Sequence, residues 1–160
     1  MIPKAEPEGI TELLENIPTV MKPYRHWVCW RLEERDDKLT KIPYDPLTAR
    51  HASSTDSRTW RSFDEAVAAL EVGEYDGIGF VFSSGDPFTG IDLDKCRNPE
   101  TGELEPWAAE IVAKSGSYAE ASPSGTGVHI IVRGKAPNKK RGRVEAYSSE
   151  RYFTMTGRVL

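Results

Sequence analysis

The sequence predicts an α+β fold in which a mostly antiparallel sheet carries two or three helices on one face. Three observations support this fold class. Short segments rich in β-branched and aromatic residues recur along the chain and are separated by turn residues. Two longer segments have apolar residues at helical spacing between clear start and stop signals. Two pairs of strands are joined by short turns, which predicts hairpins and therefore antiparallel pairing.

The first half of the chain contains the clearest helix signal, over residues 62–73. Ser62 is placed as an N-cap, Glu65 three residues later completes a capping box, and Gly73 follows the last turn. The elements expected in this half are a short amphipathic helix (9–17), a strand (26–32), a turn with a short strand (35–46), the helix (62–73) and a buried strand (76–82).

The second half is richer in strands. Its one expected helix covers residues 105–116, with Trp107 and Ile111 one turn apart and Gly116 after the end. The other elements expected here are a strand (88–94) in a hairpin with 76–82, two strands (117–123 and 128–134) around a loop (124–127), and a final hairpin (143–148 with 151–157).

The composition is that of an ordinary globular domain, with 38% hydrophobic and 29% charged residues. The 160 residues fit one domain over 1–160. No apolar run is long enough to cross a membrane, and no secretory leader is recognisable, so we expect a cytoplasmic protein without a membrane partner. Cys29 and Cys96 have neither metal-ligand spacing nor a disulfide framework. The net charge of −4 excludes nucleic-acid binding through overall charge.

The charge is nevertheless unevenly distributed. Residues 133–143 (RGKAPNKKRGR) carry six cationic side chains and no acid. One interpretation is a solvated loop between strands. The other is a surface for nucleic acid, for which the candidates are Lys139, Lys140, Arg141 and Arg143.

Three acids are the candidate catalytic and metal-binding residues. Asp92 and Asp94 alternate with apolar residues in the strand expected over 88–94, so they share a face roughly 7 Å apart and repel each other unless a cation lies between them. Glu145 lies between apolar residues in a later strand. Three carboxylates from neighbouring strands form an oxygen-rich site for Mg²⁺ or Mn²⁺, and a pair of such ions suits in-line phosphoryl transfer.

A small-residue loop leads into a strand histidine. Ser124, Gly125, Thr126 and Gly127 precede His129. Loops of this kind usually only turn the chain, but their hydroxyl and N–H groups can also bind phosphate. Beside the three acids, we expect the loop and His129 to donate hydrogen bonds to a nucleotide.

These segments resemble a known family. GIDLD, SPSGTGVHI and VEAYSSERYFTMTG, in this order, are similar to motifs I, II and III of the archaeo-eukaryotic primase superfamily, and most of all to the primase-polymerases of phages and plasmids. HWVCW, KIPYDP, ASSTDSRTW and DGIGFVF also fit that branch. The resemblance runs from about residue 24 to the end and implies an RRM-like catalytic sheet.

The resemblance also implies a role for single residues. Asp92 and Asp94 correspond to metal ligands, Glu145 to the third acid, and Ser124 and His129 to contacts with the phosphates of the incoming nucleotide. Further positions expected near the nucleotide are Gly125 and Thr126 in the loop, Lys41 in KIPY, and Arg151 and Tyr152 in ERYF.

The implied function is the catalytic core of a DNA primase-polymerase, which transfers nucleotides from nucleoside triphosphates to a 3′-hydroxyl on a single-stranded DNA template. Family members usually continue into a helical primer-binding segment and often a helicase. Neither is recognisable in this sequence, so we expect these parts to act in trans or to be missing from the chain.

Two alternatives remain open. One is a module that binds nucleotide or nucleic acid without catalysing transfer itself. The other is a metal-dependent nuclease or phosphohydrolase, although no lysine stands two residues after Asp92, Asp94 or Glu145, as a common nuclease motif requires. The preference between dNTP and NTP depends on a wall beside the 2′-hydroxyl, for which Tyr147 and Tyr152 are candidates. The four tryptophans are expected mainly in the core.

Overall fold

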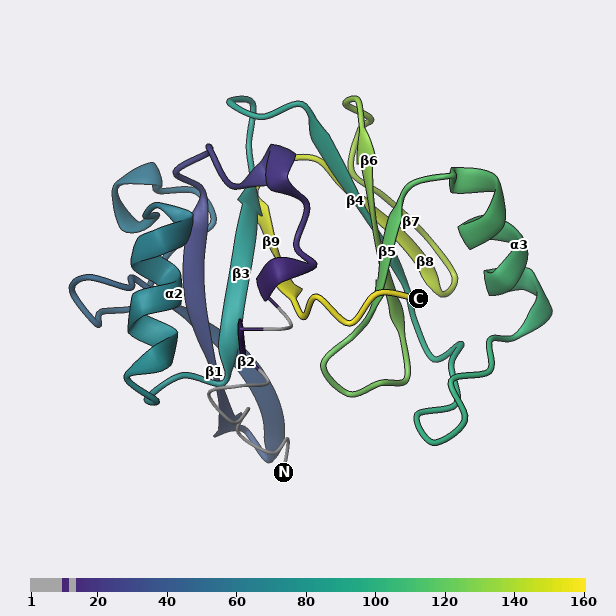
Figure 1. The fold of residues 1–160 in the computed structure, drawn as a ribbon, viewed down its shortest axis with the longest axis horizontal. Helices are drawn as coiled ribbons and strands as arrows, with labels where there is room; N and C mark the ends of the chain where they lie inside the picture. Colours follow the sequence, from purple (N-terminus) through teal and green to yellow (C-terminus); the bar gives the residue numbers. More distant parts are fainter. Residues whose placement is uncertain (1–9, 12–13) are drawn as a thin grey trace.

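The computed structural model describes residues 10–11 and 14–160. Its described part contains two antiparallel sheets between two helices, α2 (Phe63–Glu71) and α3 (Pro106–Ser115), which lie on opposite sides of the molecule (Figure 1). Two 3-10 helices, η1 (Thr19–Met21) and η2 (Ser57–Thr59), lie in connections. The predicted α+β class is confirmed.

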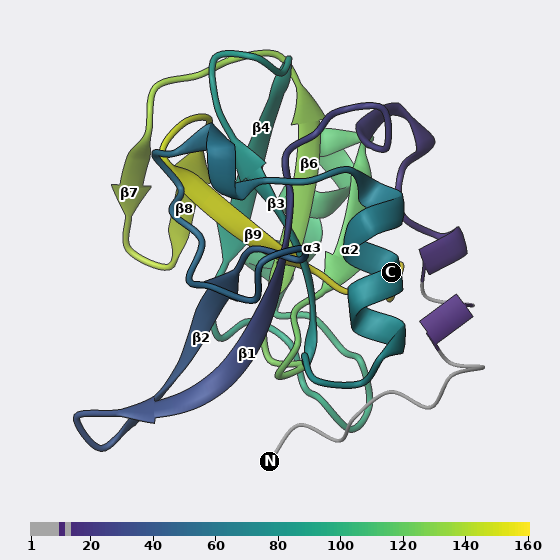
Figure 2. The ribbon, with the colours of Figure 1, turned by 90° about the vertical axis from the view of Figure 1, so that its left-hand side faces the viewer.

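The first sheet has four strands in the order β2-β1-β3-β9. Its strands are β1 (Trp27–Arg35), β2 (Lys38–Tyr44), β3 (Gly77–Phe82) and β9 (Arg151–Met155). The face that bears Trp27 and Cys29 packs on α2, where the Cys29 Sγ lies 3.4 Å from the Ala66 carbonyl oxygen. Ser62 and Glu65 form the expected capping box at the start of α2. Figure 2 shows the β1–β2 hairpin projecting away from the body.

The second sheet has five strands in the order β5-β6-β4-β8-β7. Its strands are β4 (Phe88–Leu93), β5 (Tyr118–Ala121), β6 (Val128–Arg133), β7 (Lys139–Arg141) and β8 (Val144–Tyr147). One face, which includes Leu93 and Ile130, forms a core with α3. The other face meets the first sheet, because Phe88 and Ile131 belong to the same core cluster as Phe153 of β9.

Both predicted hairpins are wrong, although the strands themselves are present. β3 pairs with β1 and β9, whereas β4 pairs with β6 and β8, so the turn over 83–87 leads from one sheet to the other. The turn between β8 and β9 also joins the two sheets. Turn residues predict that the chain reverses, but the burial of both strand faces decides which partner each strand takes.

Two further expectations differ from the structure, and a third lies partly outside the described residues. Each sheet has its own helix, whereas the sequence suggested helices on one face of a single sheet. The expected strand 88–94 ends at Leu93. The expected helix 9–17 is only partly described: residues 10–11 and 14–15 are helical, and residues 9, 12 and 13 lie outside the described residues.

The core contains most of the tryptophans, as predicted. Trp27, Trp30 and Trp60 are 0%, 3% and 6% exposed, and Trp107 is partly buried against the α3 cluster. Within residues 10–11 and 14–160, no helix combines the length and the apolar character needed to cross a bilayer.

Gly90 of β4 provides the close contact between the sheets. A Cβ atom at this position would lie 2.5 Å from the Phe153 Cε2 and 2.6 Å from the Phe82 Cζ. We expect Gly90→Ala to lower the free energy of unfolding by about 1–3 kcal/mol, because overpacking moves both rings. Urea denaturation measures the effect. Gly85→Ala is the control, since its nearest neighbour is 3.4 Å away, and an equal effect of both changes would contradict the prediction.

Candidate active site

One row of polar side chains crosses the five-stranded sheet. The strand register places Asp92 of β4 opposite His129 of β6 on one side and Glu145 of β8 on the other. His129 in turn lies opposite Glu120 of β5, and Glu145 lies opposite Lys140 of β7. Residues directly opposite each other in antiparallel strands point to the same face. The fold therefore brings two of the three predicted acids and the predicted histidine into one row.

The row lies on the face that meets the four-stranded sheet. The Phe153 ring stacks on the His129 ring, with centroids 4.7 Å apart and an interplanar angle of 26°. The neighbouring residues Ile91 and Leu93 point to the opposite face and pack with α3. The row is consequently covered at its His129 end, while the side chain of Asp92 remains 34% exposed.

Asp92 lies at the centre of the local charge distribution. Burial is the main reason that its pKa is raised above the ordinary value, and the negative charges of Asp94 and Glu145 add to the increase. His129 and Lys41 oppose it with positive charge. When neighbouring acids disfavour the ionisation of a carboxyl group, a bound cation favours the ionised form. Because Asp92, Asp94 and Glu145 all offer carboxylate oxygens, these three side chains suit a hard divalent cation.

The three acids are not arranged as a ready metal site. Among the residues that the structure describes, no group of three His, Cys, Asp or Glu side chains is positioned to hold a metal ion. Asp94 lies one residue beyond the end of β4 and is exposed, whereas Asp92 is partly buried. Metal binding by Asp92, Asp94 and Glu145 stays a prediction.

Arg143 holds the backbone beside Asp94. The Asp94 N–H donates to the Arg143 carbonyl oxygen at 2.8 Å, and the Arg143 guanidinium donates to the Lys95 carbonyl oxygen at 3.0 Å. The same guanidinium bonds to Glu105 at 2.7 Å and lies 4.6 Å from the Trp107 ring centroid. Arg143, predicted from sequence to contact nucleic acid, thus makes its contacts with the protein in this structure.

Lys41, Arg151 and Tyr152 come from the four-stranded sheet. Burial lowers the pKa of the Lys41 ammonium, while the charges of Asp92 and Asp94 oppose that shift, so Lys41 shares the electrostatic environment of the acids. The Tyr152 hydroxyl donates to the Lys41 carbonyl oxygen at 2.6 Å. Arg151 is exposed, and its guanidinium lies 5.3 Å from the Tyr147 ring centroid.

The predicted phosphate loop is a compact turn before β6. The Ser124 and Thr126 hydroxyl oxygens are 2.8 Å apart, and Gly125 has a φ of +80°, a left-handed conformation that favours glycine. Two arginines support the loop through its carbonyl oxygens: Arg97 donates to Gly125 at 2.9 Å and Arg158 donates to Ser122 at 2.7 Å. Neither arginine belongs to a recognisable motif in the sequence, because each is an isolated cation.

The basic segment is divided between two roles. Lys139, Lys140 and Arg141 form the exposed strand β7 at the edge of the sheet. Lys135, by contrast, bonds to Asp86 at 3.0 Å and to the carbonyl oxygens of Phe88 and Ser148 at 3.0 and 2.6 Å. Lys135 therefore fixes the base of the β7–β8 hairpin, and the three β7 cations remain available to a ligand.

A pocket of about 370 Å³ opens beside the row and not over it. It begins at Lys95, the residue after Asp94, and its lining comprises residues 95–98 and 103–106. Neither Asp92 nor Glu145 contributes to this lining.

Comparison with known proteins agrees with the motifs. No model of a known protein family matches the chain. A curated relative is the DNA primase-polymerase of Nitratiruptor phage NrS-1, which is 39% identical over 157 aligned residues. The alignment covers 92% of this chain and 21% of the relative, so the chain spans a minor part of the relative's length. Over nearly its whole length, the chain is therefore a relative of a phage DNA primase-polymerase, which confirms the resemblance to the primase-polymerases of phages.

Proposed function

We propose that this chain is the catalytic core of a DNA primase-polymerase, which transfers a nucleotide from a nucleoside triphosphate to a 3′-hydroxyl on a single-stranded DNA template. The observation that carries the proposal is the position of Asp92, directly between Glu145 and His129 on one sheet face. Such a face presents negative oxygen ligands beside a hydrogen-bond donor, which is what a metal-bound triphosphate requires.

Each residue has a separate role in the proposal. Asp92, Asp94 and Glu145 would hold Mg²⁺ or Mn²⁺, and these ions, when bound, would acidify the attacking hydroxyl and neutralise phosphate charge. The imidazole of His129 and the hydroxyl of Ser124 would donate to phosphate oxygens, and Gly125 and Thr126 shape the loop beside them. The backbone N–H groups of Gly125 and Thr126 already donate to the Ser122 carbonyl oxygen and the Ser124 hydroxyl, so Thr126 would contribute its hydroxyl.

The first sheet completes the nucleotide site in this proposal. The Lys41 ammonium balances the charge of the acids, and Arg151 lies at the exposed start of β9, where it can approach a phosphate. The Tyr152 ring is held by its hydroxyl on β2, so it can act as a fixed wall for the sugar. Whether dNTP or NTP is preferred depends on that wall.

Primer extension tests the proposal. The 160-residue chain is incubated with a primed single-stranded template, each of the four dNTPs or NTPs, and Mg²⁺ or Mn²⁺. Extension that depends on both the metal and the template base supports the proposal. Nucleotide binding without incorporation would favour the non-catalytic binding module, and degradation of the primer would favour a nuclease. A helicase or helical partner stays a prediction, which adding such a partner in trans would test.

We also propose that β7 holds the DNA template through phosphate contacts. Reversing Lys139, Lys140 and Arg141 to glutamate should weaken binding of single-stranded DNA about equally for all sequences and flatten its salt dependence. Fluorescence anisotropy at several salt concentrations measures both effects, starting from a Kd on the order of 10⁻⁵ M, typical of non-specific binding.

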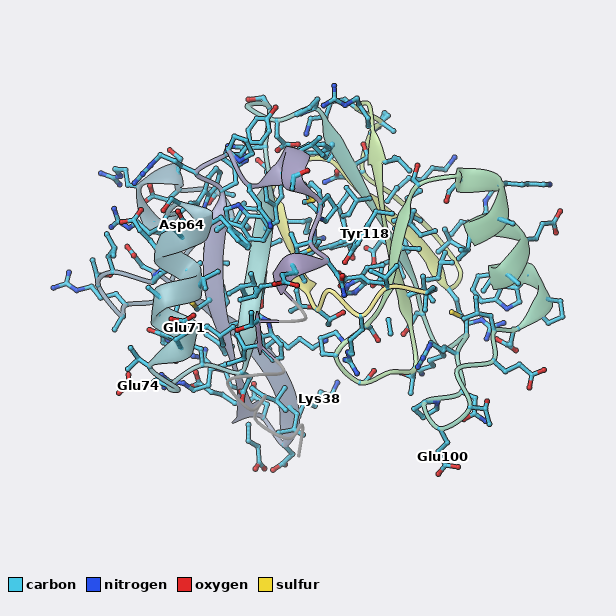
Figure 3. All side chains as sticks on the ribbon, viewed as in Figure 1. Lys38, Asp64, Glu71, Glu74, Glu100 and Tyr118 are labelled. Carbon is cyan, nitrogen blue, oxygen red and sulfur yellow. The ribbon has the colours of Figure 1, made fainter. Side chains whose placement is uncertain are left out.

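The matched control for this prediction changes the net charge equally at other exposed sites. It combines Lys38→Glu, Arg50→Glu and Lys114→Glu, which lie outside the β7–β8 hairpin. Lys38, at the far end of the β1–β2 hairpin, is labelled in Figure 3. Equal losses in the two triple variants would show that β7 is not the template surface.

A further inference from the structure

Glu120 is a fully buried carboxylate at the end of the polar row. It lies on β5 and is 0% exposed. Burial of a charged group is costly unless hydrogen bonds replace the lost water. Its place in the SYAEASP segment gave no functional signal, because a single glutamate in a strand ordinarily faces solvent. The structure therefore identifies a residue that sequence analysis did not.

Four donors meet the two oxygens of Glu120. Oε1 accepts from the Tyr118 hydroxyl at 2.8 Å and from the Gly157 N–H at 3.1 Å. Oε2 accepts from the Thr156 N–H at 2.8 Å and lies 3.3 Å from the Nδ1 of His129. Figure 3 shows Tyr118 in the central part of the molecule. Because residues 156–157 follow β9, Glu120 also connects the end of one sheet to the other.

These contacts define the orientation of the His129 ring. An ionised carboxylate only accepts hydrogen bonds, so Nδ1 of His129 carries a proton when it bonds to Glu120. The other nitrogen, Nε2, then lies on the side of Asp92, 3.8 Å from its Oδ1. The Phe153 ring covers one face of the imidazole. The ring is thus fixed at one edge and on one face, with Nε2 directed to the acids.

We propose that Glu120 is a positioning residue for nucleotide transfer: it accepts a hydrogen bond from the Nδ1–H of His129 and so holds the ring with Nε2 directed toward the triphosphate, to which Nε2 donates when both ring nitrogens carry a proton. This inference rests on the proposed function. Carboxylates that accept from one nitrogen of a metal-bound histidine fix the orientation of its ring in the same way. Glu120 itself touches neither the acids nor the nucleotide, because His129 stands between Glu120 and Asp92.

Glu120→Gln is the informative substitution, since it preserves the volume and replaces an acceptor oxygen by an NH₂ donor. We expect kcat/KM for nucleotide incorporation to fall about 10- to 100-fold, the range typical of carboxylates that orient a metal-bound histidine. In a His129→Ala background the same substitution should have little further effect, because the group through which it acts is gone. A merely structural role would lower activity equally in both backgrounds.

Asp45→Asn is the matched control. Asp45 is also buried, at 3% exposure, and its carboxylate accepts from the Leu47 N–H at 2.9 Å and from Arg61 at 2.8 Å. It lies in the segment after β2, outside the polar row. We expect Asp45→Asn to reduce stability and to leave kcat/KM nearly unchanged, so loss of a buried carboxylate alone does not explain an effect at Glu120.

A measurement on the unaltered protein keeps the inference testable if Glu120→Gln fails to fold. ¹⁵N NMR of the histidine side chains reports which nitrogen of His129 is protonated, and we expect Nδ1–H. A wild-type ring that carries its proton on Nε2 alone, or full activity of Glu120→Gln beside an impaired His129→Ala, would overturn the role of Glu120 while leaving the proposed function standing. Failure of the wild type to extend primers would instead overturn the proposed function and, with it, the role of Glu120 in transfer.

Discussion

The Asp92→Ala, Asp94→Ala double variant should lose nucleotide incorporation by more than about a thousandfold, which corresponds to about 4 kcal/mol of transition-state stabilisation. The reason is that the variant removes the central carboxylate of the polar row and its neighbour, and leaves Glu145 as the last predicted metal ligand. Primer extension with Mg²⁺ and with Mn²⁺ measures the loss. Incorporation at the wild-type rate would show that the active site is elsewhere.

The control for this variant removes the same charge far from the row. Glu71 and Glu74, at and after the end of α2, are exposed and lie on the outer side of the molecule (Figure 3). Glu71→Ala combined with Glu74→Ala should leave incorporation unchanged. An equal loss in this control would attribute the effect to overall charge rather than to the site.

Substitution of Asp92 should raise the stability of the fold, although it lowers activity. The pKa of Asp92 is raised in the folded chain, mainly by burial, so its ionisation is less favourable there than in the unfolded chain. At pH 7 the ionised group therefore lowers the free energy of unfolding, and Asp92→Asn should raise it. The gain should shrink as the pH falls through the raised pKa of folded Asp92 and disappear below the ordinary aspartate pKa of 3.8, where the wild-type carboxyl is protonated in both states. Urea denaturation from pH 3 to 7 measures this difference.

His129→Ala is expected to have the second largest effect on catalysis. We expect the KM for nucleotide to rise, because His129 provides a donor to the phosphates, and kcat to fall as well if that bond strengthens in the transition state. A loss of about 10²-fold in kcat/KM is typical of a preorganised donor of this kind. Isothermal titration with a nucleoside triphosphate and metal separates the binding part from the turnover part.

Unchanged binding and turnover in His129→Ala would contradict the role of His129 in the nucleotide site. If both nucleotide affinity and turnover are unchanged in His129→Ala, the histidine is only a packed residue under the Phe153 ring. His51→Ala is a suitable control, because His51 is exposed in the segment after β2 and contacts the Tyr44 ring instead. A loss of affinity in His129→Ala but not in His51→Ala would support the phosphate role.

The sequence by itself determined the local elements and the candidate acids. The capping box at Ser62 and Glu65, and Gly116 after α3 with a φ of +55°, depend on neighbouring residues only, and both agree with the structure. The alternation of β4 likewise predicted that Asp92 faces away from Ile91 and Leu93. Such local signals survive because they follow from backbone geometry within one element.

Only the tertiary structure decided which strands became partners. The two expected hairpins are connections between the two sheets. Because β4 pairs with β6 and β8, Asp92 lies between His129 and Glu145, which are far from Asp92 in the sequence. The same pairing brings Glu120 to His129 and engages Arg143 with Glu105. Long-range pairing is set by which faces can be buried together and not by any local pattern, so these contacts could not be read from the sequence.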